Sequence, residues 1–202
     1  MTRTNAPRAV RSDAWNNRQK LLEAALDAFS VQGVDAPLDR IARQAGVGIG
    51  TLYRHFPTRE SLVMAAYQHD VEQLCAAADD LARHLPAEAA LRAWMERFSA
   101  YLVTKRGMMQ VIQAVVAQPG SFYASVNVRA RMLNALETLL RLGTEAGVFR
   151  RDMEAEVVLL ALTGVWNASA GPQGPRRAAQ LIELLLDGLK TQPAEGWVSR
   201  SG

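Results

Sequence analysis

The stretch that most constrains this chain is residues 38–61 (LDRIARQAGVGIGTLYRHFPTRES), because two short helical patterns meet there at glycines. Residues 38–45 place apolar side chains on one face of a helix, and Gly46 can adopt the positive φ needed where that helix ends. Residues 49–56 repeat the helical spacing, and Pro57 cannot continue the helix. The stretch therefore predicts two helices of about two turns each, joined by a tight turn.

A third helix is predicted directly after these two, because Thr58 is a good N-cap and Glu60 lies in the first turn. The two short helices have the form of a helix-turn-helix, whose second helix lies in the major groove of DNA. Such pairs also occur in helical proteins that do not bind DNA. The side chains opposite the apolar seam favour DNA binding, since hydroxyl, imidazole and guanidinium groups suit phosphates and base edges. These residues are Thr51, Tyr53, Arg54, His55, Thr58 and Arg59.

The positive charge of the chain is concentrated in its first third. Residues 1–60 contain nine basic and six acidic side chains, and the whole chain has a formal net charge of +3. The rest of the chain is therefore electrically balanced. A local excess of positive charge around the predicted helix-turn-helix is consistent with contact to a polyanion in this part of the chain.

The composition is that of a globular protein with an ordinary core. The chain has 202 residues, of which 49% are hydrophobic, enough for one large or two small domains. Its single cysteine, Cys75, excludes an intrachain disulfide, and the sequence has neither a signal-type apolar segment nor an apolar run long enough to span a bilayer. We expect a cytoplasmic protein without a membrane partner.

The N-terminal region precedes the helix-turn-helix with two different patterns. Residues 1–12 contain three arginines among small and polar residues, which predicts a flexible basic arm. This arm is either a frayed terminus or a contact to phosphates or the minor groove. Residues 13–31 carry an apolar stripe that ends before Gly33, so they predict a first helix that can support the following pair.

The remaining sequence is helical in pattern, with no strand signal and no internal repeat. An uninterrupted apolar face predicts one long helix from Thr58 to about His84, so the domain boundary should fall within a continuous helix. Five further helices are predicted at residues 86–106, 108–117, 122–145, 152–170 and 176–190. We therefore expect an all-α protein of about nine helices. It should consist of a DNA-binding domain at 13–60, a helical domain at 61–192 and a flexible tail at 193–202.

The last two predicted helices, 152–170 and 176–190, are apolar around much of their circumference. Between Glu156 and Ala170 no residue is charged. Part of this surface would face water in a monomer, which is typical of an interface, so we expect a homodimer through these helices. The alternative is that both helices simply lie at the centre of the core.

The sequence at residues 41–62 resembles the signature of the TetR (tetracycline-repressor) family of bacterial transcriptional regulators. The matching positions are Ile41-Ala42, Ala45-Gly46-Val47, Gly50-Thr51-Leu52-Tyr53, His55-Phe56 and Arg59-Glu60-Ser61-Leu62. Pro37 and Gly48 depart from the pattern, because relatives commonly have a hydroxyl residue at both places, and the helix caps there should be weaker. The resemblance implies an N-terminal three-helix DNA-binding domain and a C-terminal helical bundle for ligand binding and dimerisation.

The resemblance also implies which residues contact DNA. Gly50 and Thr51 would approach bases and phosphates, and Arg54 is the candidate for a base edge such as that of guanine. Thr58 and Arg59 would hold phosphates at the N-terminus of the next helix. The implied DNA-binding residues are Arg40, Gly50, Thr51, Tyr53, Arg54, His55, Thr58 and Arg59.

In this family the C-terminal domain holds a small-molecule cavity, and its occupation changes the separation of the two DNA-reading heads. Large or adaptable residues could line such a cavity here, and each could equally fill an ordinary core. They are Trp94, Phe98, Tyr101, Met108, Met109, Gln113, Phe122 and Trp166. The resemblance thus implies a ligand-responsive repressor that binds a pseudo-palindromic operator in double-stranded DNA as a dimer and is released by a small-molecule effector.

The sequence shows no recognisable catalytic or metal-binding constellation, so we expect no enzyme activity, no metal and no cofactor. His69 and Glu72 have the spacing of half a metal site, but a solvated helix face explains them as well. Two alternatives stay open beside the ligand-responsive regulator. One is a DNA-binding regulator without an effector, and the other is a helical-bundle enzyme or ligand carrier.

Overall fold

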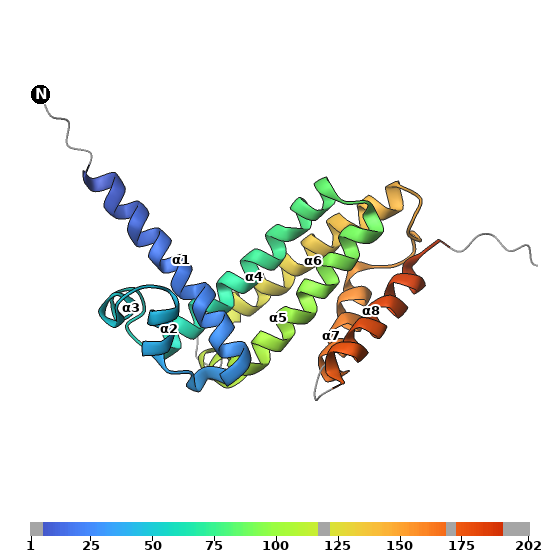
Figure 1. Ribbon diagram of the computed structural model, residues 1–202. Coiled ribbons are helices and arrows are strands. Elements are labelled where there is room, and N and C mark those ends of the chain that lie inside the picture. Colours follow the sequence, from blue (N-terminus) through green and yellow to red (C-terminus); the bar gives the residue numbers. More distant parts are fainter. Residues whose placement is uncertain (1–5, 117–121, 169–172, 192–202) are drawn as a thin grey trace, which may run out of the picture. The chain divides into compact units, whose positions relative to one another are not determined.

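The computed structural model describes residues 6–116, 122–168 and 173–191, with side chains for residues 13–114, 128–164 and 173–191. Within these ranges the chain is all-helical and contains no strand, as predicted (Figure 1). The helices are α1 (Ala6–Gln32), η1 (Gly33–Asp35, a 3₁₀ turn), α2 (Leu38–Gln44), α3 (Ile49–His55), α4 (Arg59–His84), α5 (Ala87–Val116), α6 (Phe122–Glu145), α7 (Ala155–Ala168) and α8 (Gly174–Leu189).

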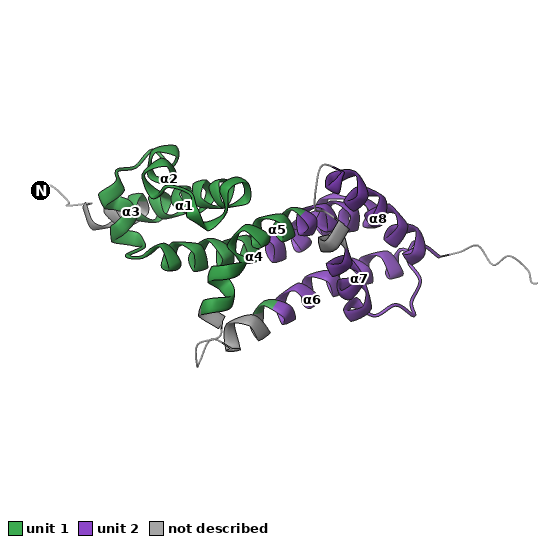
Figure 2. Cartoon of the chain, turned by 90° about the horizontal axis from the view of Figure 1, so that it is seen from below, with its two compact units in different colours: residues 1–73, 100–128 green, residues 74–99, 129–202 purple. Residues whose placement is uncertain are grey.

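The chain divides into two compact units, which share three of its helices (Figure 2). Unit 1 consists of residues 1–73 and 100–128, and unit 2 consists of residues 74–99 and 129–202. The boundaries therefore cross α4, α5 and α6, so each of these helices contributes to both units. The functional domains proposed from the sequence, with limits at residues 60 and 192, stay predictions.

In unit 1, α1 packs against α2 and α3, and α2 packs against α3. The predicted apolar stripe of α1 is buried, with Leu22 and Phe29 both fully shielded from solvent. Ile41 of α2 and Leu52 of α3 are also fully buried. The first helix therefore supports the two short ones, as the sequence predicted.

The turn between α2 and α3 has the predicted glycine geometry. Gly46 has a φ of +70°, and its N–H donates to the carbonyl of Arg43 over 3.1 Å. The Val47 N–H donates to the carbonyl of Ala42 over 3.0 Å. These two bonds satisfy carbonyls that the end of α2 would otherwise leave without a donor, in the pattern of a Schellman motif.

The N-terminal caps differ in strength, also as predicted. Pro37 and Gly48 are the N-caps of α2 and α3, and neither makes a side-chain cap hydrogen bond. Before α4, Thr58 and Ser61 cap each other: the Ser61 N–H donates to Thr58 Oγ1, and the Thr58 N–H donates to Ser61 Oγ, each over 3.1 Å. This reciprocal pair fixes the start of the long helix.

The prediction that a helix ends near residue 106 was wrong, because α5 runs without a break from Ala87 to Val116. Gly107 lies inside this helix, where a Cβ would overlap the carbonyl group of Phe29. The glycine thus serves the close approach of α5 to α1 rather than a helix end. One long helix replaces two expected ones, so the described chain has eight α-helices instead of about nine.

The first helix also begins earlier than its sequence pattern indicated. We expected a start at Asp13, whereas α1 begins at Ala6. The backbone of residues 6–12, part of the predicted basic arm, is therefore helical. Residues 1–5 lie outside the described part of the chain.

Unit 2 has its own core. Trp94 is fully buried, stacks on Phe98 with ring centroids 5.5 Å apart, and donates its indole N–H to the carbonyl of Leu74 over 3.0 Å. Elsewhere in the unit α7 packs against α8. Phe149 fits over Gly143 of α6, where a Cβ would overlap its ring.

Candidate nucleic-acid interface

The helix α3 is anchored by its apolar side and presents the opposite side to solvent. Leu52 is fully buried and Phe56, at its C-terminal end, is 3% exposed. Tyr53 is 49% exposed, and Arg54 is exposed beside it. Gly50 is also exposed, and a Cβ added there would meet no described atom within 4 Å apart from those of its chain neighbours and its own helical backbone. This face has the form of a recognition helix held against a supporting helix.

The predicted DNA-binding residues differ in their exposure. Arg40, Gly50, Tyr53, Arg54 and Thr58 are exposed, whereas Thr51, His55 and Arg59 are half-buried. The α3 sequence contains no acidic residue. Within the described residues, Arg40 and Arg54 form no ion pair, while their neighbour Arg43 is paired with Asp39 at 2.8 Å. The unpaired guanidinium groups of Arg40 and Arg54 are therefore available to phosphates or base edges.

Arg59 has a role that the sequence did not predict. Its Nη1 donates to the carbonyl oxygens of Val34 and Ala36, over 2.5 Å and 2.6 Å. These carbonyls belong to η1 and to the turn before α2. Arg59 therefore fastens α4 to the start of the helix-turn-helix, and contact to a phosphate is left to its remaining N–H groups. No local sequence signal connects residues so far apart in the chain.

The N-terminus of α4 already carries a negative charge. The pKa of the Glu60 carboxyl is lowered by its own backbone N–H and by the Thr58 side chain, with Arg59 adding a smaller attraction. This arrangement places a carboxylate in the first turn, where a helix favours anions. A phosphate at Thr58 would have to lie beside that charge.

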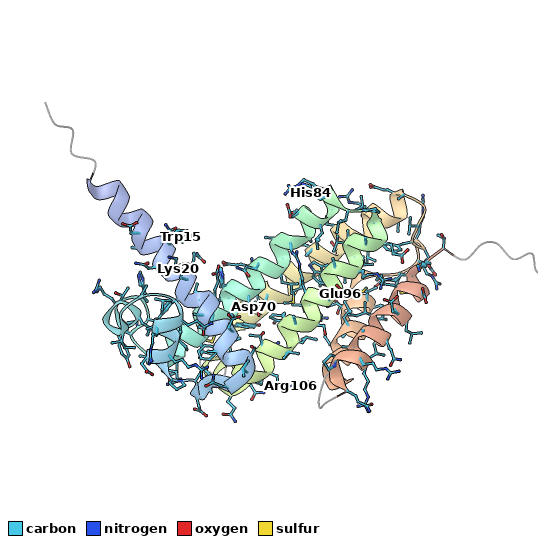
Figure 3. The ribbon with its side chains drawn as sticks, in the orientation of Figure 1. Trp15, Lys20, Asp70, His84, Glu96 and Arg106 are labelled. Carbon is cyan, nitrogen blue, oxygen red and sulfur yellow. The ribbon has the colours of Figure 1, made fainter. Side chains whose placement is uncertain are left out.

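The first helix adds two contacts to this region. The guanidinium of Arg18 lies 5.4 Å from the centroid of the Phe56 ring, and Asp27 accepts a hydrogen bond from Gln44 over 3.2 Å. Trp15 is 61% exposed and lies with Lys20 on α1 (Figure 3). Neither Arg18 nor Trp15 was predicted from the sequence as a site residue. The only sequence pattern that links Trp15 with Arg18 is their spacing of three residues, which places them side by side on a helix surface.

The residues proposed to line an effector cavity fall into two groups. Trp94 and Phe98 lie together in the core of unit 2, as described above. In unit 1, Tyr101 and Met108 are buried, Met109 is half-buried and Gln113 is exposed. The side chains of Phe122 and Trp166 lie outside the described part. The lining of an effector cavity therefore stays a prediction. The Tyr101 hydroxyl donates a hydrogen bond to the Tyr67 hydroxyl over 3.4 Å.

The described residues contain neither a candidate metal site nor a helix that could span a membrane. They hold no group of three or more His, Cys, Asp or Glu side chains that could bind a metal ion. His69 bonds instead with Gln73, one turn along α4, over 2.8 Å. None of the helices described is both long enough and apolar enough to cross a membrane.

Comparison with known proteins finds a family match in the N-terminal part of the chain and another in the C-terminal part. Residues 21–66 match the family model described as "Bacterial regulatory proteins, tetR family". Residues 86–191 match the model described as "Transcriptional regulator SbtR-like, C-terminal domain". The second match alone spans more than half of the chain. The chain belongs to the TetR family.

Solved structures of TetR regulators share this fold over nearly their full length. A TetR transcriptional regulator of Streptomyces coelicolor is 43% identical, with a TM-score of 0.81 over 87% of this chain and 99% of that one. A TetR transcription regulatory protein of Mycobacterium vanbaalenii is 30% identical, with a TM-score of 0.71 over 90% of this chain and 99% of that one. The similarity thus includes the C-terminal helices as well as the helix-turn-helix.

The curated relatives match over a shorter stretch. An HTH-type transcriptional regulator of Staphylococcus aureus is 41% identical over 64 residues, which are 31% of this chain and 35% of the relative. The match therefore spans about a third of that protein's length. Together, the comparisons identify this TetR protein as a transcriptional regulator with a DNA-binding helix-turn-helix.

Proposed function

We propose that this TetR protein is a cytoplasmic, sequence-specific repressor that binds a pseudo-palindromic operator as a dimer and is released by a small-molecule effector. The observation that best supports DNA reading is the exposed face of α3, which carries Tyr53 and unpaired Arg54 and contains no acidic residue. A cationic, hydrogen-bonding helix face of this kind matches the donor and acceptor pattern of the major groove.

We assign each proposed DNA contact according to how exposed the residue is in the free protein. Arg54 reads a base edge, and Arg40 on α2 holds a phosphate. Tyr53 and His55 contact the backbone and groove, with Thr51 and Thr58 supplying hydroxyl groups. Gly50 allows the α3 backbone to approach the DNA closely, because open space surrounds it in the free protein. Arg59 contributes mainly by holding the domain together.

We propose that the dimer forms through α7 and α8. Val157 and Leu160 of α7 are 49% and 54% exposed, and Leu184 of α8 is 67% exposed. Gly164 continues the α7 row and Gly188 continues the α8 row, and a Cβ at either glycine would meet nothing within 4 Å. Exposed apolar rows with small residues are suited to close packing against a second copy. Such a dimer would place two copies of α3 about 34 Å apart, one turn of B-DNA.

The effector is proposed to act through the helices shared by the two units. Because α4 runs from the helix-turn-helix region of unit 1 into unit 2, a shift of α4 would move the DNA-reading head. A regulator without an effector remains the second candidate. Its support is the tight packing of Trp94 and Phe98, which are 0% and 2% exposed.

The proposed function is tested by binding of the purified protein to the DNA upstream of its own gene, beside a scrambled fragment, at two salt concentrations. We expect tight, selective binding that weakens as salt rises, since phosphate contacts release counterions. Arg54→Ala should lower selectivity, whereas Arg97→Ala, which removes an exposed charge from α5, should not. Equal weak binding to both fragments would contradict operator recognition at this site.

A further inference from the structure

Four polar side chains of α4 and α5 gather in unit 1: Tyr67 and Asp70 on α4, and Tyr101 and Lys105 on α5. The tyrosine rings are 6.3 Å apart between centroids and are inclined by 29°. Burial raises the pKa of Tyr67, and the charge of Asp70 adds a smaller rise, so the carboxylate lies close to that tyrosine. Asp70 is labelled on α4 in Figure 3. Of the four residues, only Tyr101 had been suspected from the sequence.

One oxygen of the Asp70 carboxylate has no partner. Its Oδ2 is shielded from solvent and accepts no hydrogen bond from the described residues. Burial raises the pKa of Asp70 to about 6, so the group is still mostly ionised at neutral pH. A shielded, ionised oxygen without a donor is unfavourable in a folded protein, and such groups call for a missing partner.

Lys105 does not supply that partner. Its Nζ lies 5.9 Å from the ring centroids of both Tyr67 and Tyr101, and it forms no ion pair with a carboxylate in the described chain. Burial lowers the pKa of Lys105. The faces of both rings therefore attract a cation, and one of these rings, that of Tyr67, lies close to Asp70.

We propose that Asp70, Tyr67 and Tyr101 form the polar end of the effector site, and that the effector is an amine with an apolar body. Its ammonium group donates to Asp70 Oδ2, and its carbon atoms next to the nitrogen lie against the tyrosine rings. An ammonium fits better than a neutral donor, because it also neutralises a carboxylate that burial disfavours. This assignment rests on the proposed effector-responsive function and names the chemistry of that effector.

The site is tested by calorimetric titration of the full-length protein at neutral pH with 2-phenylethylamine and with its uncharged counterpart, 2-phenylethanol. We expect the wild type to bind the amine about ten-fold or more tightly than the alcohol, and Asp70→Asn to lose this preference. Asp79→Asn, an exposed position on the same helix, should keep it. Equal affinities, no binding of either compound, or a preference unchanged in Asp70→Asn would overturn the proposal.

The unfolding temperature of a second variant distinguishes a ligand site from a carboxylate that is already hydrogen-bonded to water in the free protein. Asp70→Leu replaces the charged group with an apolar one of similar shape. If Oδ2 has no donor in the free protein, this variant should unfold at a higher temperature than the wild type. A lower unfolding temperature would show that Asp70 has a partner without any ligand, and the proposal would fail.

Release from DNA separates this proposal from the proposed function. The amine should release the wild type from its operator and leave Asp70→Asn bound, although both bind the operator without it. Amine binding at Asp70 without release would refute the effector assignment. If the wild type binds no operator at all, the proposed regulator function is wrong. The comparison of the amine with the alcohol then still decides whether Asp70 binds an ammonium group.

Discussion

Arg54 and Arg59 have different surroundings, although they lie only five residues apart in the sequence. Arg59 donates to the backbone carbonyls of Val34 and Ala36, more than twenty residues earlier in the chain. Arg54 is exposed on α3 and has no carboxylate partner in the described residues. One guanidinium therefore stabilises the domain, and the other is free for DNA.

Replacing Arg59 with Ala should lower the free energy of unfolding by about 1 to 3 kcal/mol, because two carbonyls lose a charged donor. The same variant should weaken binding to all DNA sequences and reduce the salt dependence. Arg54→Ala should change stability by no more than about 0.5 kcal/mol and should relax the preference at one base pair. Urea unfolding and titration of operator variants measure both effects. Equal stability of the two variants would contradict the structural role of Arg59.

Asp70 should make the stability of the protein depend on pH. Its pKa is raised from 3.8 to about 6, so the folded protein binds this proton more tightly than the unfolded chain. The resulting stabilisation is present below about pH 4 and is lost as the pH rises to about 6. Tyr67, on the same helix, lies close enough to feel the charge of Asp70. Tyr101 and Lys105 on α5 pack against the ring of Tyr67.

We therefore expect Asp70→Leu to gain stability relative to the wild type between about pH 4 and pH 7, by up to about 3 kcal/mol. Urea unfolding of both proteins across this range measures the difference. The Asp79→Asn variant, exposed on α4, should follow the wild type. A difference between wild type and Asp70→Leu that does not vary with pH would show that Asp70 has an ordinary pKa.

At the scale of helices, two glycines inside helical segments have opposite surroundings. Gly107 of α5 lies against the backbone of Phe29 in α1, whereas Gly50 of α3 has no neighbour within 4 Å of an added Cβ. Glycine weakens a helix unless something requires it. Packing between α1 and α5 requires Gly107. No contact among the described residues requires Gly50, which leaves close approach to DNA as its proposed purpose.

Gly107→Ala should destabilise unit 1 by about 1 to 3 kcal/mol, because the methyl group forces α5 away from α1. Gly50→Ala should instead stabilise the free protein by about 0.5 to 1 kcal/mol while weakening operator binding. Thermal unfolding and operator titration of both variants measure these changes. If Gly50→Ala bound the operator as well as the wild type, the proposed close approach would be wrong.

At the scale of the whole molecule, the proposed regulation depends on two properties that one chain alone does not display. A two-fold operator requires two copies of α3 held by a dimer. Release by an effector requires that ligand and DNA favour different arrangements of that dimer, and each must then weaken the binding of the other by the same factor. The proposed interface on α7 and α8 and the proposed amine site on α4 and α5 are the two places where this can be tested.

Leu160→Lys should convert the proposed dimer into a monomer, because it places a charge in the exposed apolar row of α7. Since Leu160 is 54% exposed in the single chain, the variant should still fold. Operator affinity should fall strongly, as the two heads are no longer linked. Val103→Lys, at a site on α5 that is 42% exposed, is the matched control and should stay dimeric. Sedimentation measures the oligomeric state, and an unchanged dimer in Leu160→Lys would contradict the interface.

Features that depend on neighbouring residues could be predicted from the amino-acid sequence alone. The apolar stripes predicted which faces of α1, α2 and α3 are buried, and Gly46 predicted the positive φ that ends α2. The cap at Thr58 and the all-α class were also correct. These features follow from helical spacing and local backbone preference, which act within a few residues of the chain.

Features that depend on which surfaces meet became visible only in the packed fold. The Gly107 position suggested a helix end, yet the close passage of α1 explains that glycine within an unbroken α5. The carbonyl partners of Arg59 and the shielded oxygen of Asp70 likewise depend on residues brought together by folding. A sequence pattern reports how residues are spaced along a helix. It does not report which distant backbone or charge a side chain will face, because that is fixed only when the helices pack.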